Sequence, residues 1–375
     1  MHIEKIDLIT VRMPLVHPFT TSFSTQTERY PLLLRVTASI DGRSVIGWGE
    51  CVALKEPFYS PEYLDGAREA LQRFLLPGLF ATQAQGLRVT AQSVGAAMRH
   101  VVGHRMAKAA VEMAVLDAQL RSAGISFAEH LGVTRTSVPS GVSVGIEDKI
   151  PNLLAQVDDY VAQGYVRVKL KIRPGWDVEP VKAVRERFGD IALQVDANAA
   201  YRLSDVSTLR RLDPFDLLLI EQPLAEEDLR QHAVLARQIA TPICLDESVV
   251  SAQSAADAIA LGAASVINIK PGRVGGYLEA VRIHDLAVAN GVAVWCGGML
   301  ETGLGRSANA ALAGLPGFTL PGDISASDRF YQRDITEPVV MEDGGVAVPQ
   351  GPGFGVEPIP ELLTEYTVDS VEVTA

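Results

Sequence analysis

The sequence predicts an α/β fold: a modified TIM barrel of the (β/α)7β type, preceded by an α+β domain. From about residue 137, eight short apolar runs alternate with seven helical segments. The runs are almost continuously apolar, as parallel strands are when both faces of their sheet are covered. Several consecutive runs also end in a charged residue. A closed barrel gathers functional groups from many strand ends at one face, whereas an open doubly wound sheet concentrates them at one switch point, so the pattern favours the barrel.

The first part of the chain predicts strands followed by helices. Strands are expected at residues 1–15 and 30–54, and helices at residues 61–79 and 91–124. The second helical stretch is apolar on most of its surface, which predicts a helix buried between layers, and Gly124 suits its C-terminal cap. We therefore expect an α+β domain over residues 1–128. Residues 18–30, rich in Thr, Ser and Phe, form either a plain surface loop or a lid over a pocket.

The barrel is expected over residues 129–323. Its predicted strands are SVPSGVSVG, VRVKLKI, IALQVDAN, DLLLIEQPL, TPICLDES, AASVINIK, GVAVWCGGML and FTLPGD. An amphipathic helix near residues 148–163 follows the first strand, and a helical segment follows each of the next six. Residues 324–375 continue no repeat and read as extended, so we expect them to return to the N-terminal domain.

Composition narrows the class of protein. The chain has 375 residues and a net charge of −12, which argues against a surface for nucleic acid or an anionic membrane. No apolar run approaches the roughly 20 residues of a membrane span. The N-terminus has no basic region followed by an apolar stretch, so no signal peptide is expected. Cys51, Cys244 and Cys296 form no CxxC pair and suit buried free thiols in a reducing cytoplasm.

Five charged residues recur at a nearly constant spacing, each at or near the end of a predicted strand. They are Lys171, Asp196, Glu221, Asp246 and Lys270, separated by 25, 25, 25 and 24 residues. A strand and its return helix take roughly 25 to 30 residues. All five side chains are therefore expected to open onto one face of the barrel, where three acids could bind a cation between two ammonium groups.

The three acids have the character of a site for a hard metal ion. None of the seven histidines and no cysteine occupies an equivalent strand end, which favours Mg²⁺ or Mn²⁺ over Zn²⁺. The alternative is that each acid caps a helix or pairs with a surface cation. Asn198 follows Asp196 closely. Glu247 follows Asp246 directly and would point to the other side of its strand, in a supporting role.

The lysines are the second half of the pattern. Lys169 and Lys171 are two residues apart on one strand and point to the same face, where ammonium groups are costly unless they meet anions. Lys270 lies on the far side of an eight-stranded barrel from Lys171. Arg273 could crowd Lys270 and lower its pKa, which would make a general base near neutrality, or it could be an ordinary loop arginine. Opposed lysines beside a cation suit proton removal next to a carboxylate, because the cation offsets the charge of the enediolate.

The motifs that carry this chemistry also match a known family. They are KLKI with PGWD, VDANAAY, IEQPL, CLDES, INIKPGRVGG and VWCGGMLETGLGR. Over about residues 105 to 325 the chain resembles the enolase superfamily, in its muconate-lactonising-like branch. More narrowly, it resembles the o-succinylbenzoate synthase / N-succinylamino acid (N-acylamino acid) racemase family. A lysine base with Mg²⁺ that stabilises an enediolate is the known pattern of this superfamily.

The resemblance implies a role for each matching residue. It implies that Mg²⁺, or another divalent cation such as Mn²⁺, is held by Asp196, Glu221 and Asp246. It implies acid/base catalysts on opposite faces of the substrate at Lys171 and Lys270, with Lys169 neutralising the substrate carboxylate. It implies contacts to the distal acyl end by Ser143, Gly298 and Met299, with Asn198 and Glu247 in supporting positions. It also implies that the N-terminal domain with residues 18–30 caps the barrel mouth, and that the protein is a homo-oligomer.

Two reactions on small-molecule carboxylates share such a site. In racemisation of an N-acylamino acid, one lysine removes the α-proton and the other returns one. In dehydration to o-succinylbenzoate, a step of menaquinone biosynthesis, Lys171 would be both base and acid. Arg273 within KPGR resembles the racemase-capable members. The alternatives are a muconate-type cycloisomerase and a catalytically silent metal- or ligand-binding barrel, while the run from Gly322 to Ser325 lacks the DxD pair typical of a dipeptide epimerase.

Overall fold

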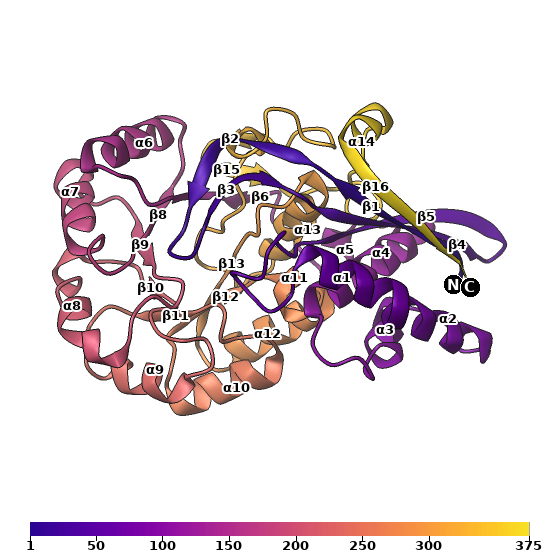
Figure 1. Ribbon diagram of the computed structural model, residues 1–375, viewed down its shortest axis with the longest axis horizontal. Helices are drawn as coiled ribbons and strands as arrows, with labels where there is room; N and C mark the ends of the chain where they lie inside the picture. Colours follow the sequence, from indigo (N-terminus) through magenta and orange to yellow (C-terminus); the bar gives the residue numbers. More distant parts are fainter. Residues whose placement is uncertain (375) are drawn as a thin grey trace.

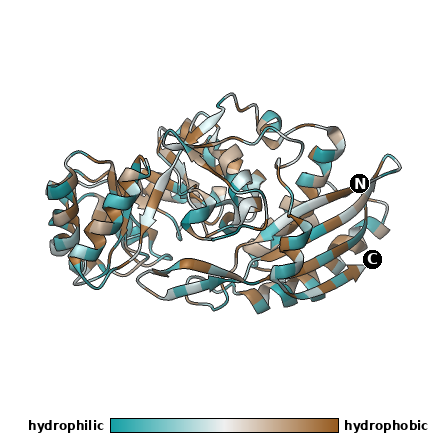
Figure 2. Ribbon diagram, turned by 90° about the horizontal axis from the view of Figure 1, so that it is seen from above, coloured by the Kyte–Doolittle hydropathy of each residue, from teal (hydrophilic) through white to brown (hydrophobic). Residues whose placement is uncertain are grey.

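The predicted fold class is confirmed by a computed structural model, which describes residues 1–374. Figure 1 shows a barrel on one side of an elongated molecule and the N-terminal strands and helices on the other. Hydrophilic and hydrophobic residues alternate along the outer barrel helices in Figure 2, as expected for helices with one face in the core. Within residues 1–374, no helix has the length and apolar character needed to cross a membrane.

The barrel is built from one parallel sheet. In spatial order its strands are β13 (Ala293–Cys296), β12 (Val266–Ile269), β11 (Ile243–Leu245), β10 (Ile220–Glu221), β9 (Leu193–Asp196), β8 (Arg167–Lys171) and β7 (Gly141–Val144). The helices between and after them are α6 (Ile150–Ala162), α7 (Val178–Phe188), α8 (Val206–Arg210), α9 (Leu229–Ala236), α10 (Ala252–Leu261), α12 (Tyr277–Ala289) and α13 (Gly303–Ala313). The short helix α11 (Pro271–Val274) precedes α12. Because every strand is parallel, all their carboxyl ends meet at one mouth.

The eighth predicted strand closes the barrel by isolated bridges instead of a ladder. Phe318 pairs with Val294 of β13, and Gly322 pairs with Ser140 just before β7. The Gly141 N–H donates to the Gly322 carbonyl at 2.8 Å. Pro321 lies within this segment and has no N–H to donate, which explains why a continuous ladder does not form.

The first predicted barrel strand is also divided. Its front part is β6 (Ser137–Pro139), which pairs with β15 (Gly345–Ala347), and only its rear part is β7. The strand β14 (Met341–Glu342) completes this small sheet. The helix α5 (Phe127–Leu131) precedes β6 in the chain.

The N-terminal domain is a four-stranded sheet covered by helices. The sheet order is β16 (Thr367–Thr374), β1 (His2–Val11), β4 (Leu32–Ile40) and β5 (Arg43–Cys51). Its helices are α1 (Leu64–Ala70), a π-helical turn (Leu71–Leu75), α2 (Leu76–Ala84), α3 (Ala91–Ala97) and α4 (Arg105–Ala123). The buried helix α4 lies so close to β5 that a Cβ atom at Gly47 or Gly49 would come within 2.1 Å of its backbone. The expected buried helix is therefore present, and glycines on the facing strand allow its approach.

The helix expected at residues 91–124 is instead two helices. The chain leaves α3 at Ala97 and enters α4 only at Arg105. Gly103 and His104 between them have φ angles of +67° and +49°, a left-handed conformation that interrupts a helix. The other predicted helix begins at Leu64 and continues to Ala84, beyond the expected end at residue 79.

The segment at residues 18–30 is a β-hairpin. It consists of β2 (Met13–Thr20) and β3 (Thr25–Arg29), which pair antiparallel and lie over the barrel mouth in Figure 1. The Ile146 N–H, just after β7, donates to the Thr20 carbonyl at 2.9 Å. Of the two alternatives, a plain surface loop is excluded, because β2 and β3 pair over most of the segment.

The C-terminal segment runs back across the molecule and ends in the N-terminal sheet. After the helix α14 (Pro360–Tyr366), β16 pairs antiparallel with β1, from Val11 opposite Thr367 to Lys5 opposite Thr374. Figure 1 shows the two ends of the chain side by side. The segment was expected to be extended, but it also contains a 3₁₀ turn (Ser327–Arg329), irregular stretches and α14.

Two buried glutamates of the N-terminal domain bind the first turns of two barrel helices. The Glu112 side chain on α4 accepts the Leu278 N–H of α12 at 3.0 Å. The Glu50 side chain on β5 accepts the Gly305 N–H of α13 at 3.0 Å. Burial raises the pKa of each carboxyl group to about 7. These contacts fix the domain against the barrel.

Glu112→Gln is expected to stabilise the protein at pH 8 and to have little effect at pH 4.5. The folded pKa of Glu112 lies above its ordinary value of 4.5, so between these values the folded state retains a proton that the unfolded state has lost. Stability therefore falls as the pH rises through this window, by at most about 3 kcal/mol. Glutamine keeps the acceptor oxygen and does not ionise. Urea unfolding at both pH values measures the effect, with Glu186→Gln on the exposed face of α7 as the control, and an equal change at both pH values would contradict the assignment.

Candidate active site at the barrel mouth

The base of the barrel interior is filled by side chains and forms the platform of the site. Leu219, Cys244, Val266 and Trp295 form a fully or almost fully buried cluster there. The ring centroid of Trp295 lies 4.7 Å from the Nζ atom of Lys169. Charged side chains therefore begin directly above this apolar layer.

Lys169 is the most deeply placed of the three lysines. Its Nζ atom lies 2.6 Å from Asp323, 2.9 Å from Glu221 and 3.5 Å from Asp196. Burial alone lowers the pKa of Lys169, but the surrounding carboxylates outweigh it and hold the pKa above its ordinary value. Lys169 is therefore a permanent positive charge at the centre of the site.

Lys171 lies two residues further along β8, nearer the mouth. Its Nζ atom donates to Asp196 at 2.6 Å and to the Asn198 side-chain oxygen at 2.8 Å. The other end of the Asn198 amide donates to Glu247 at 2.9 Å. Asn198 has a φ angle of +42°, which its short amide side chain tolerates better than most residues do. The chain of contacts fixes the position of the Lys171 amine.

The three predicted acids lie at neighbouring strand ends beneath the cavity. Asp196 on β9 and Glu221 on β10 are direct neighbours in the sheet register, and Asp246 follows β11. None of the three is more than 1% exposed. Burial and the negative charge of Asp196 raise the pKa of Glu221 to about 8. For Asp246, burial acts in the same direction, but Lys270 and Arg273 outweigh it and hold the pKa below its ordinary value.

The acids are bound to amines instead of being gathered around a common point. Among residues 1–374, no three His, Cys, Asp or Glu side chains are close enough together to hold a metal ion as they stand. The donor set nevertheless suits a hard divalent cation, since it consists of buried carboxylates on adjacent strand ends without imidazole or thiolate. Burial and the neighbouring charge of Asp196 raise the pKa of Glu221, and a cation held between these carboxylates would offset their repulsion. On this ground the residues fit the ion.

Lys270 enters the site from the other side of the barrel. Its Nζ atom lies 2.7 Å from Asp246 and 3.2 Å from the Tyr59 hydroxyl. Arg273 does not crowd Lys270 as expected, because its guanidinium pairs with the second oxygen of Asp246 at 2.8 Å. Burial lowers the pKa of Lys270, but Asp246 outweighs burial and the net pKa lies well above its ordinary value. Of the two possibilities for Arg273, crowding that lowers the pKa of Lys270 is not found, because Lys270 and Arg273 share the Asp246 carboxylate.

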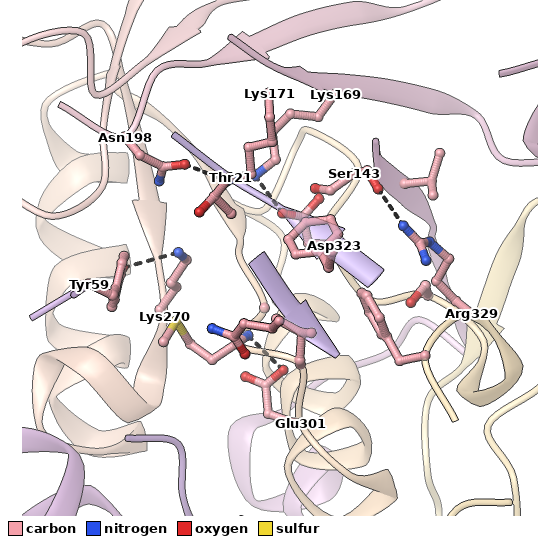
Figure 3. A pocket seen from close by; sticks show the side chains of 18 of the residues that line it. Thr21, Tyr59, Ser143, Lys169, Lys171, Asn198, Lys270, Glu301, Asp323 and Arg329 are labelled. Carbon is pink, nitrogen blue, oxygen red and sulfur yellow. Dashed lines mark hydrogen bonds and ion pairs between the residues drawn. The ribbon is translucent and has the colours of Figure 1, made fainter. Parts of the chain in front are cut away.

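A cavity with an empty volume of about 760 Å³ lies between these groups and the β2–β3 hairpin. Figure 3 shows Lys171 and Lys270 reaching toward it from opposite sides. The predicted residues that line it are Lys169, Lys171, Lys270, Asn198, Ser143, Gly298 and Met299. The hairpin contributes Phe19, Thr21, Phe23 and Gln26. The structure therefore brings the two predicted catalysts and the predicted substrate contacts to one cavity, with the acids below its floor.

Two further predicted residues, Glu247 and Met299, make contacts within the protein beside the cavity. Glu247 does not line the main cavity and contacts Asn198, as expected for a side chain on the far side of its strand. The Met299 N–H donates to the Glu301 carboxylate at 2.8 Å. The Met299 N–H is thus already engaged within the protein, although Ser143, Gly298 and Met299 all line the cavity.

The sequence did not point to several charged or polar residues of the site. They are Tyr59, Arg167, Asn268, Asp323 and Arg329. Asn268 had a signal, because it precedes Lys270 by two residues and so shares its face, and it donates to Glu221 at 2.6 Å. Tyr59 had none, since it lies in an irregular segment between β5 and α1.

The fold and the site together define a class of α/β-barrel enzymes in which acids and lysines at strand ends face a cavity covered by an N-terminal domain. The chain belongs to the mandelate racemase / muconate lactonizing enzyme family of the enolase superfamily. Residues 5–132 match the family described as Mandelate racemase / muconate lactonizing enzyme, N-terminal domain, and residues 152–362 match Enolase C-terminal domain-like. The family resemblance of the motifs is thereby confirmed.

Similar proteins extend over the whole chain. An N-succinylamino acid racemase from an Amycolatopsis species is 61% identical over 372 residues, covering 99% of both chains. An o-succinylbenzoate synthase from Bacillus subtilis is 43% identical over 367 residues, covering 98% of this chain and 97% of that protein. The crystal structure of an enolase superfamily member from Listeria innocua is 38% identical, with a TM-score of 0.94 over 100% of this chain and 99% of that one.

Proposed function

We propose that this enzyme is an N-succinylamino acid racemase that also catalyses o-succinylbenzoate synthesis. The observation that carries the proposal is the opposed placement of Lys171 and Lys270 across one cavity. Inversion at a carbon atom needs one group to remove the α-proton and a second to deliver a proton to the other face. The relative at 61% identity, named N-succinylamino acid racemase, supports racemisation, and the relative at 43% identity supports the dehydration.

Asp196, Glu221 and Asp246 would hold Mg²⁺, or Mn²⁺ or a similar divalent cation. When bound, the ion offsets the negative charge that develops on the carboxylate oxygens as the α-proton leaves. Two of these acids, Asp196 and Glu221, lie 3.5 and 2.9 Å from Lys169, whose positive charge adds to the same effect. Lys169 thereby neutralises the substrate carboxylate without taking part in proton transfer.

The proton transfers belong to the two opposed lysines. One of them, as a neutral amine, accepts the α-proton, and the other, as an ammonium ion, donates a proton to the opposite face. Asn198 holds the Lys171 amine at 2.8 Å, and the Tyr59 hydroxyl holds that of Lys270 at 3.2 Å. In the dehydration, Lys171 would act on one face as both base and acid, and Lys270 would contribute positive charge.

The N-terminal domain would close the cavity and exclude water. The aromatic side chains Phe19 and Phe23 of the hairpin line the cavity, and Phe23 packs against Tyr59 with ring centroids 5.8 Å apart. We divide the chain into this capping domain at residues 1–128, the barrel at 129–323 and the returning segment at 324–375. A cytoplasmic homo-oligomer is part of the same proposal, consistent with three buried free cysteines.

Hydrogen exchange tests the proposal directly. In D₂O with Mg²⁺, the enzyme is expected to introduce deuterium at the α-carbon of an N-succinylamino acid and to interconvert its enantiomers. It is also expected to convert the o-succinylbenzoate precursor. Mass spectrometry and chiral chromatography measure the products, and a sample with EDTA is the control. Absence of both α-exchange and dehydration in the presence of Mg²⁺ would refute the proposed function.

A further inference from the structure

Arg329 is a positively charged residue in the cavity wall that has no part in the proposed proton transfers. It ends a short 3₁₀ turn (Ser327–Arg329) in the C-terminal segment, beyond the last barrel strand. Its side chain lines the same cavity as Lys171 and Lys270. Figure 3 shows it on the side of the cavity away from Lys270 and Tyr59.

The surroundings of this guanidinium contain no carboxylate partner. Within residues 1–374, no Asp or Glu oxygen lies within 4.0 Å of it. Its Nη2 atom donates to the Ser143 carbonyl at 2.9 Å, and its buried Nε atom has no hydrogen-bond partner. Asp323 is already engaged by Lys169 and Arg167, at 2.6 and 2.8 Å.

Three aromatic rings surround the guanidinium instead. Its central carbon lies 4.9 Å from the ring centroid of Tyr160, 4.7 Å from Phe330 and 5.8 Å from Phe19. Burial therefore lowers the pKa of Arg329, although the group remains charged. Arg329 is half-buried, and a cation partly removed from water without an anion is costly, so an anionic group of a ligand would find a strong and pre-positioned partner here.

The position of Arg329 relative to the lysines defines the shape of that ligand. Ser143, to which Arg329 is bound, lies directly beside Lys169 in the register of β7 and β8. In the proposed function, Lys169 and the acids take one carboxylate of the substrate. A second carboxylate near Arg329 would lie across the cavity from Lys270. A ligand that met both Lys169 and Arg329 would therefore be a dianion with two separate carboxylates.

We infer that Arg329 recognises the distal carboxylate of the N-succinyl group and so selects N-succinyl over N-acetyl substrates. This inference rests on the proposed function and names a determinant of its substrate class. An N-acetyl group has the same amide but no anion for the guanidinium. The competing explanation is purely structural, in which Arg329 only holds Phe19 and Phe330 in place.

Binding measurements separate these two explanations. Isothermal titration calorimetry of the full chain, in the presence of Mg²⁺, would compare the affinities for N-succinylglycine and N-acetylglycine. Neither ligand can racemise, because the α-carbon of glycine is not a stereocentre. We expect the unchanged protein to prefer N-succinylglycine, and Arg329→Gln to weaken its binding roughly 10- to 100-fold while leaving N-acetylglycine binding almost unchanged. Arg333→Gln is the matched control, since it removes the same charge from an exposed arginine paired with Glu365. We expect that control to leave both affinities unchanged.

Other outcomes would overturn the inference. Equal losses for both ligands would assign Arg329 to a structural role, and no loss for N-succinylglycine would exclude contact with the carboxylate. Arg329→Lys provides a second variant that keeps the charge, and it should retain a smaller preference for the succinyl ligand. The D₂O exchange experiment on the same samples keeps the two proposals apart, because absent exchange with an intact, Arg329-dependent succinyl preference would refute only the reaction.

Discussion

Lys270→Ala is expected to reduce racemisation by roughly 10²- to 10⁴-fold, the usual contribution of a positioned proton-transfer group. Lys270 and Lys171 reach the cavity from opposite sides, so neither can replace the other at its own face of the substrate. The variant should still exchange the α-proton of one enantiomer with D₂O, through Lys171. Chiral chromatography and mass spectrometry, each started from both enantiomers, measure the two effects.

The comparison with the opposite lysine makes this result decisive. Lys171→Ala should lose racemisation together with the dehydration, and any remaining exchange should occur from the other enantiomer. Lys182→Ala, on the exposed face of α7, should change neither reaction. Racemisation by Lys270→Ala at the original rate would refute the assignment of two bases.

Glu221→Gln is expected to lower turnover at least about 10³-fold and to raise the Mg²⁺ concentration needed for half-maximal activity. The change removes the central acid of the three while keeping the size of the side chain. It also removes a charged partner 2.9 Å from Lys169 and an acceptor 2.6 Å from Asn268. Turnover as a function of Mg²⁺ and calorimetric Mn²⁺ binding measure the two effects separately.

The control for this variant is Glu69→Gln, which removes an exposed partner of Arg73 on the N-terminal domain. It should leave both metal binding and turnover unchanged. An unaltered metal affinity in Glu221→Gln would exclude this residue as a ligand, whatever the effect on turnover.

Local patterns in the sequence account for much of the barrel. Strands β8 to β13 follow from short apolar runs, and the charged residue that ends a run predicts the face on which it lies. The failures are also local in origin. Pro321 prevents a full eighth strand, and the left-handed backbone at Gly103 and His104 divides a continuous helical pattern.

The site depends more on contacts between distant parts of the chain. The nearly constant spacing of Lys171, Glu221 and Lys270 predicts that they lie at the same end of the barrel, because the spacing matches the strand–helix repeat. Tyr59 and Arg329 come from irregular segments on either side of the barrel sequence, and no periodicity connects them with the lysines. The pairing of Arg273 with Asp246 could likewise not be predicted from the sequence. Regular spacing predicts which residues lie near one another, but not which side chains form an ion pair.

The pairing of β1 with β16 ties the cover of the cavity to the order in which the chain is synthesised. Residues 2–11 leave the ribosome early, yet their neighbours at residues 367–374 are made more than 350 residues later. The β2–β3 hairpin continues directly from β1, so it gains a fully flanked anchor only when the last strand arrives. A chain that ended within α14 would therefore contain every lysine and acid of the barrel site. Its N-terminal sheet, which supports the β2–β3 hairpin over the cavity, would lack β16. Synthesis through β16 is, in this architecture, needed before β1 is flanked on both sides.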